Sequence, residues 1–121
     1  MANTIKTELQ NYCDGIAKEL INLYNAAPTD EERERAEAEG EACDLWGYFG
    51  DVLDVEYTIS ARGVFLGARV AVTLGGPNVY VDTRNGEVNG YWGSDSATAF
   101  LPYDVRDAIN DIFAELYDSM R

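Results

Sequence analysis

The spacing of apolar residues changes twice along this chain, and these changes constrain its fold more than any other feature. Apolar side chains recur at helical spacing over 4–26 and 30–49, and at every second position from Leu53 to about Gly93. Spacing near 3.6 residues is typical of an amphipathic helix, whereas strict alternation indicates a strand with one buried face. Helical spacing returns after residue 99. We therefore expect an α+β fold in which helices precede and follow one sheet.

Two N-terminal helices are expected. The first ends before Pro28, because a residue that precedes proline is pushed out of the helical conformation. Thr29 and Glu32 have the spacing of a capping box, which starts the second helix. Gly40 and Gly47 weaken this helix by up to about 1 kcal/mol each relative to alanine. Its expected buried side consists of Ala38, Ala42, Leu45, Trp46 and Phe49.

The alternating segment predicts four antiparallel strands, at 53–60, 64–74, 78–83 and 87–93. The inward positions of the second strand are expected to be Val64, Leu66, Ala68, Val70, Val72 and Leu74. Asn85-Gly86 separates the last two strands and is typical of a type I′ hairpin turn. The polar stretch 94–99 is expected to be a loop that leads to the C-terminal helix, which opens at Pro102. The apolar side of that helix is Val105, Ala108, Ile109, Ile112, Phe113, Leu116 and Met120.

These elements predict a single domain over residues 1–121. Two N-terminal helices precede a four-stranded antiparallel meander, and a C-terminal helix packs on the sheet. An apolar fraction of 46% supports a folded core.

The chain is strongly acidic, with 22 Asp and Glu residues against 9 Lys and Arg residues, no histidine and a formal charge of −13. A field of this sign repels nucleic acid and anionic lipid, and attracts cationic protein surfaces. We therefore expect no direct contact with nucleic acid and no contact with membranes. The alternative interpretation is that the acidity only keeps the protein soluble.

Much of this charge falls into two rows at helical spacing. At about 100° and about 1.5 Å per residue, each row spans an arc of roughly 80° and a length of about 21 Å. The row in the C-terminal helix consists of Asp104, Asp107, Asp111, Glu115 and Asp118. The row in the second helix consists of Asp30, Glu34, Glu37, Glu41 and Asp44. Asp51, Asp54 and Glu56 are expected to extend the second row onto the first strand.

These carboxylates are the predicted partner-binding residues. Like charges four residues apart destabilise a helix by about 0.2–0.5 kcal/mol each, so unneutralised rows carry a cost. Their pitch is similar to that of the phosphates along one nucleic-acid strand, which recur about every 3.4 Å. The alternative is that both rows are simply the solvated faces of amphipathic helices.

The sequence carries no motif for catalysis or for a bound cofactor. It has no histidine, no phosphate-binding glycine loop and no nucleophile motif, so we expect neither an enzyme nor a metal or cofactor site. Residues 82–87 place oxygen ligands beside a glycine, but hairpin chemistry accounts for them. Cys13 and Cys43 lie among apolar neighbours, which favours reduced thiols in a cytoplasmic protein; a disulfide between them is the alternative.

In size, acidity, mixed topology and lack of catalytic residues, with rows at 30–44 and 104–118, the chain resembles small inhibitors that phages and mobile elements direct at host nucleases. Anti-CRISPR proteins and antirestriction DNA mimics are the groups in question. The resemblance implies a DNA mimic that binds the basic surface of a CRISPR effector or another nuclease in the host cytoplasm. Residues 79–88 are also similar to the hairpin of PepSY-type modules, which are associated with peptidase inhibition.

A second hypothesis is a protein–protein interaction module, monomeric or homodimeric, that uses an aromatic surface of the sheet or of a helix. Tyr80, Tyr91 and Trp92 on the strands and Trp46, Tyr48 and Phe49 at the end of the second helix are its candidate residues.

Overall fold

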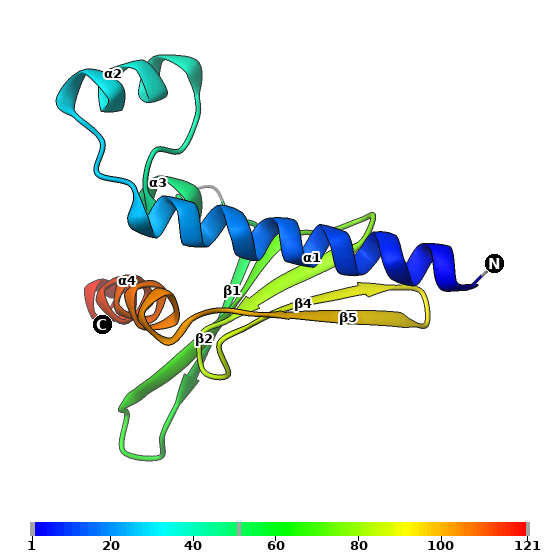
Figure 1. Cartoon of the computed structure of the whole chain (residues 1–121). Helices are drawn as coiled ribbons and strands as arrows, with labels where there is room; N and C mark the ends of the chain where they lie inside the picture. The colour runs from blue at the N-terminus through cyan, green and yellow to red at the C-terminus, as the bar shows by residue number, and fades with distance from the viewer. Residues whose placement is uncertain (1, 51, 121) are drawn as a thin grey trace.

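The computed structural model describes residues 2–50 and 52–120 and has an α+β fold, as the sequence predicts. Five antiparallel strands form one sheet, and helices occupy both ends of the chain (Figure 1). The helices are α1 (Ala2–Asn25), α2 (Asp30–Glu39), α3 (Leu45–Phe49) and α4 (Tyr103–Met120). The strands are β1 (Asp54–Ile59), β2 (Phe65–Thr73), β3 (Asn78–Asp82), β4 (Glu87–Trp92) and β5 (Asp95–Phe100). Their order in the sheet is their order in sequence, so β1 and β5 are the two edges.

Helices α1 and α4 cover the same face of the sheet. Helix α1 packs across β4 and β5, and α4 packs against β2 and touches α1. Leu9 and Cys13 of α1 are fully buried above Gly90 of β4, where an added Cβ would lie 2.5 Å from the Cys13 sulfur. A glycine at position 90 therefore lets α1 approach the sheet closely. No helix within residues 2–50 and 52–120 is long and apolar enough to cross a membrane.

The sheet has five strands rather than the four expected, because residues 95–100 form β5 instead of a loop. Ala97 and Ala99 point into the core, while Ser96 and Phe100 are exposed. The segment does alternate, but its inward residues are alanines, which give a weak hydrophobic signal. Gly93, at a φ of 61°, supplies the tight turn that returns the chain along β4.

The predicted second helix, 30–49, is also wrong in extent, since it is divided into α2 and α3. Gly40 adopts the left-handed conformation at a φ of 70°, and its N–H bonds to the carbonyls of Ala36 and Glu37. This ends α2, because such a residue caps a helix and turns the chain away. Of the expected buried side, Leu45 and Phe49 reach the core from α3, but Ala38, Ala42 and Trp46 are exposed.

Strand β2 carries two irregularities that change which residues face the core. Its pairing shifts opposite Thr58 and Ile59 and again between Ala71 and Thr73. A bulge reverses the side to which the following residues point. The expected inward residues Val64, Leu66 and Leu74 are therefore exposed, and Phe65 packs against the core instead.

The β3–β4 hairpin is confirmed, but its turn is not type I′. Asp82 pairs with Glu87, so the connection has four residues, and Gly86 N–H donates to the Asp82 carbonyl at 2.9 Å. Gly86 has a φ of 69°, whereas Asn85, like every described residue other than glycine, has a negative φ. The Asp82 carboxylate accepts hydrogen bonds from the N–H groups of Arg84 and Asn85 and so stabilises this wider turn.

Candidate protein-binding surface

The predicted acidic row of the C-terminal helix lies on one continuous helix in the structure. Helix α4 runs for 18 residues and buries one side against the sheet, at Val105, Ile109, Ile112 and Phe113. Asp104, Asp111, Glu115 and Asp118 are exposed and Asp107 is half-buried. All five residues thus share one helix, with the roughly 80° arc that their spacing predicts.

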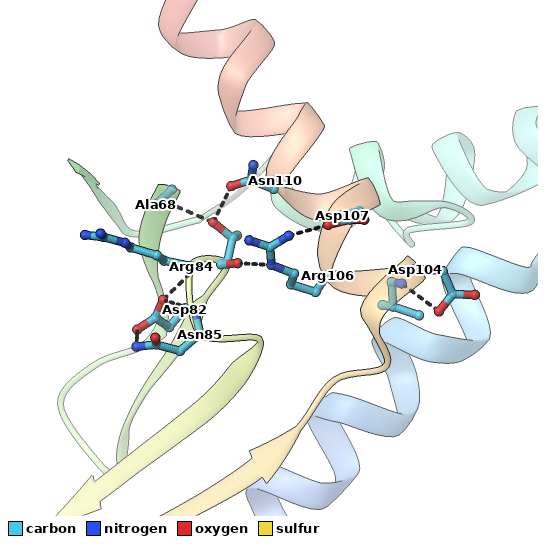
Figure 2. Close-up of polar contacts among 10 residues, drawn as sticks. Ala68, Asp82, Arg84, Asn85, Asp104, Arg106, Asp107 and Asn110 are labelled. Atoms are coloured by element: carbon cyan, nitrogen blue, oxygen red, sulfur yellow. Dashed lines mark hydrogen bonds and ion pairs between the residues drawn. The ribbon is translucent and has the colours of Figure 1, made fainter. Parts of the chain in front are cut away.

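One member of this row is neutralised locally. Arg106 forms an ion pair with the adjacent Asp107, and its Nε donates to the Thr83 carbonyl at 2.6 Å (Figure 2). The arginine is thereby held on the β3–β4 turn, beside Asp107. The charge of the row is therefore smaller than the sequence suggests, and Asp111 and Glu115 lie at its centre.

Thr83 fixes the same corner of the molecule. Its hydroxyl accepts a hydrogen bond from the Ala68 N–H at 2.9 Å and donates one to the side-chain amide oxygen Oδ1 of Asn110 at 2.7 Å. The side chain is completely buried, so both partners depend on it for their hydrogen bonds. Strand β2, the β3–β4 turn and α4 are joined at this one residue, which sets the position of the α4 row relative to the sheet.

The predicted row at 30–44 does not exist as one ridge. Asp30, Glu34 and Glu37 lie on α2, whereas Glu41 follows the break at Gly40 and Asp44 caps the next helix. Residues at helical spacing form one stripe only if they lie on one continuous helix. The left-handed conformation of Gly40 interrupts the helix, so the stripe is broken there. Asp44 accepts hydrogen bonds from Gly47 N–H at 2.8 Å and from Arg33 at 2.7 Å, so it is a structural residue.

Helix α2 is nevertheless acidic throughout and entirely solvated. It carries six acidic residues in ten and buries none of its side chains. The capping box predicted for Thr29 and Glu32 is present, and Figure 1 shows α2 standing away from the sheet. A helix without a buried face gains little from packing, so its caps and the Arg33–Asp44 ion pair are the described contacts that hold it.

The sequence predicts that Asp54 and Glu56 extend the second row onto the first strand; both lie on β1, but the row at 30–44 is not continuous. Both are exposed on β1 and point away from the core, toward the sheet face that α1 and α4 leave uncovered. Asp51 lies outside the described residues. The predicted site residues therefore occupy at least two sides of the molecule instead of one continuous anionic face.

The uncovered sheet face also carries an aromatic and cationic group that the sequence indicated only in part. Tyr80 and Tyr91 do share this face, with ring centroids 6.1 Å apart. The guanidinium of Arg69 lies 3.6 Å from the Tyr80 ring centroid, a cation–π contact that the sequence analysis missed. The alternation around Arg69, between buried Ala68 and Val70, was the available signal for its outward direction.

The structure gives no sign of metal or disulfide chemistry in its described part. Residues 2–50 and 52–120 contain no group of three or more His, Cys, Asp or Glu side chains that could hold a metal ion. Cys13 and Cys43 are both free. Burial, followed by the negative charge of Asp14, raises the pKa of the Cys13 thiol, which makes it a poor nucleophile.

Comparisons of this chain with models of protein families, with curated proteins and with solved structures gave no match. Its function has to be inferred from its own surface.

Proposed function

We propose that this protein is an acidic inhibitor that occupies the basic nucleic-acid-binding surface of another protein, such as a CRISPR effector or another nuclease. The observation that carries the proposal is the row of carboxylates on α4, which one uninterrupted helix presents to solvent over about 21 Å. Lysine and arginine side chains that bind phosphates along a groove would meet negative charge at a similar pitch.

The position of the acids on α4 supports a role in binding, because acids at this position do not stabilise the helix. Glu115 and Asp118 lie toward the C-terminal end of the helix, where the helix dipole is negative, and the last turn of the described helix has no basic residue. An acid in the last turn, such as Asp118, opposes the dipole at a cost of about 0.3–1 kcal/mol. Mixed charges would give solubility without that cost.

Helix α2 provides a second anionic element for the same partner. Its six acidic residues are all exposed, and none of its residues is buried. A fully exposed, charged helix adds little to the core and raises the rate of encounter with a cationic surface.

The test is competition with DNA for a nuclease. A panel of nucleases and CRISPR effectors would be loaded with fluorescent duplex DNA and titrated with this protein, with anisotropy as the readout. We expect one or more to release DNA, with an apparent affinity that falls steeply with salt. The double variant Asp111→Lys, Glu115→Lys should lose this activity, whereas Glu8→Lys, Asp14→Lys on α1, with the same change in charge, should keep it. Release that is unaffected by salt and by the α4 variant would contradict the proposal.

A second candidate function is a protein-interaction module that uses the uncovered sheet face. Tyr91 and Phe100 are 41% and 72% exposed on this face and at its β5 edge, which is a large exposed area for aromatic side chains. This function predicts a homodimer or a complex that tolerates salt and is lost in Phe100→Ser. Light scattering of the purified protein tests the homodimer directly.

A further inference from the structure

An apolar groove of about 220 Å³ opens where α1, α3 and α4 meet. Its apolar walls are formed by Leu23 and Tyr24 of α1, Leu45 and Trp46 of α3, and Ala108 and Ile112 of α4. Tyr24 and Trp46 are 37% and 48% exposed, so two aromatic side chains border this groove without being covered by the protein itself. Exposed aromatic walls around a concave apolar surface are typical of a site for a partner side chain.

Three acids of the α4 row lie next to Ala108, one of the residues that line this groove. Asp111 follows Ala108 by three residues and Glu115 follows it by seven, and Asp104 precedes it by four. Residues at these spacings share one face of a helix. These three carboxylates therefore lie on the side of α4 that carries Ala108, next to the groove.

The acidic helix α2 leaves and rejoins the body of the protein beside the groove. Ala26 and Asp44 both line the groove, and the chain between them contains α2. The ion pair between Arg33 and Asp44 ties α2 to the groove. The apolar groove is thus bordered by negatively charged elements from two helices.

We propose that this groove is a docking site for a basic segment of a protein partner, in which one bulky apolar side chain enters the groove and flanking Lys or Arg residues pair with α4 and α2. The inference rests on the proposed function and adds to it the chemistry of the partner. Nucleic acid does not fit such a site, because it offers neither cationic groups nor an aliphatic anchor. A basic helix with apolar residues on one face fits both the charge and the apolar walls.

The test uses two Trp-free peptides of 18 residues with identical lysine and arginine content. One carries leucines on one helical face, and in the other these leucines are serines. The protein is used as the variant Trp92→Phe, which leaves Trp46 as the tryptophan that reports on the groove. We expect the leucine peptide to bind about tenfold or more tightly, since burying one leucine contributes at least that factor. Its binding should shift Trp46 emission to the blue.

Two variants separate the groove from the charge. Trp46→Ser, or Ala108→Leu if the first variant unfolds, should bring the affinities of the two peptides together. Asp111→Lys, Glu115→Lys should weaken both peptides, and Glu8→Lys, Asp14→Lys should weaken neither by a comparable factor. The variant Trp46→Phe, which retains Trp92, should show no emission shift with the leucine peptide.

The outcomes distinguish the two proposals. If both peptides bind equally and only the α4 variant weakens binding, the groove is not a docking site, but the acidic surface remains the proposed binding surface. A leucine preference that survives in Trp46→Ser and in Ala108→Leu, or an emission shift of Trp92 in place of Trp46, also overturns the groove. Peptide binding that is unchanged by the α4 variant and by high salt overturns the proposed function. If neither peptide binds, the proposal that the partner is a basic segment is wrong.

Discussion

Arg33 and Asp44 are eleven positions apart and form an ion pair, with the guanidinium nitrogen 2.7 Å from the carboxylate. The same carboxylate accepts the N–H of Gly47 at 2.8 Å and so caps α3. Asp44 therefore joins the solvated helix α2 to the short helix α3, which is anchored in the core by Leu45 and Phe49.

Asp44→Ala is expected to destabilise the protein by about 1 kcal/mol, within the range of about 0.5–2 kcal/mol for loss of an N-cap. Asp44→Asn is the matched control, because asparagine caps a helix nearly as well but lacks the charge that pairs with Arg33. The free energy of unfolding from urea titrations measures both variants. An alanine variant as stable as the asparagine variant would show that the cap contributes nothing.

The stabilisation by Asp44 also depends on pH. The Gly47 N–H, followed by the hydrogen bond from Arg33, lowers the pKa of Asp44 below its ordinary value of 3.8. A group with a lowered folded pKa stabilises above the unfolded pKa, and this contribution is lost as the pH falls through the folded pKa. The difference in unfolding free energy between wild type and Asp44→Asn should be constant from pH 7 to about 5 and shrink below about 4. A difference that grows toward acid pH would contradict this assignment.

Gly90→Ala is expected to displace α1 from the sheet. The new Cβ would lie 2.5 Å from the Cys13 sulfur and 2.9 Å from a methyl group of Leu9, both of which are buried. Overpacking of this kind costs about 1–3 kcal/mol. Gly15→Ala is the control, since nothing lies within 4 Å of its added Cβ and alanine favours a helix by up to about 1 kcal/mol. Thermal unfolding should therefore shift in opposite directions for the two variants.

Thr83→Val is expected to cost about 1–3 kcal/mol even though it keeps the shape of the side chain. It leaves the Ala68 N–H and the side-chain amide oxygen of Asn110 without the fully buried hydroxyl that bonds both of them. Thr98→Val removes a hydroxyl that bonds only Asn89, at a half-buried site, and should cost less. Equal losses in urea titrations of the two variants would contradict the role of Thr83 as a joint.

The two cysteines should react at different rates with a thiol reagent under native conditions. Cys13 is fully buried and its pKa is raised, first by burial and then by Asp14, whereas Cys43 is half-buried. We expect one fast thiol, which disappears in Cys43→Ser, and a slow thiol whose rate follows unfolding. Fast reaction of Cys13 would show that α1 separates readily from the sheet.

Several features were fixed by the chain's local chemistry. The first helix ends before Pro28 because of a steric restriction on one residue, and Thr29 and Glu32 form their capping box within one turn. The β3–β4 hairpin follows from Asn85-Gly86, although the wider turn depends on the Asp82 carboxylate. The acidic row of α4 is predictable for the same reason, since its spacing and that of the buried side both belong to one helix.

Other features depended on contacts between distant segments. The alanines of β5 carry too little apolar signal to predict a strand, and their pairing with β4 and burial under α1 decide it. Residues 30–49 read as one helix, but α2 ends at Gly40 without a buried residue, and the separate helix α3 brings Leu45 and Phe49 into the core. The groove beside α4 is built from three helices that are far apart in sequence, so only tertiary packing could bring the aromatic walls and the neighbouring carboxylates together.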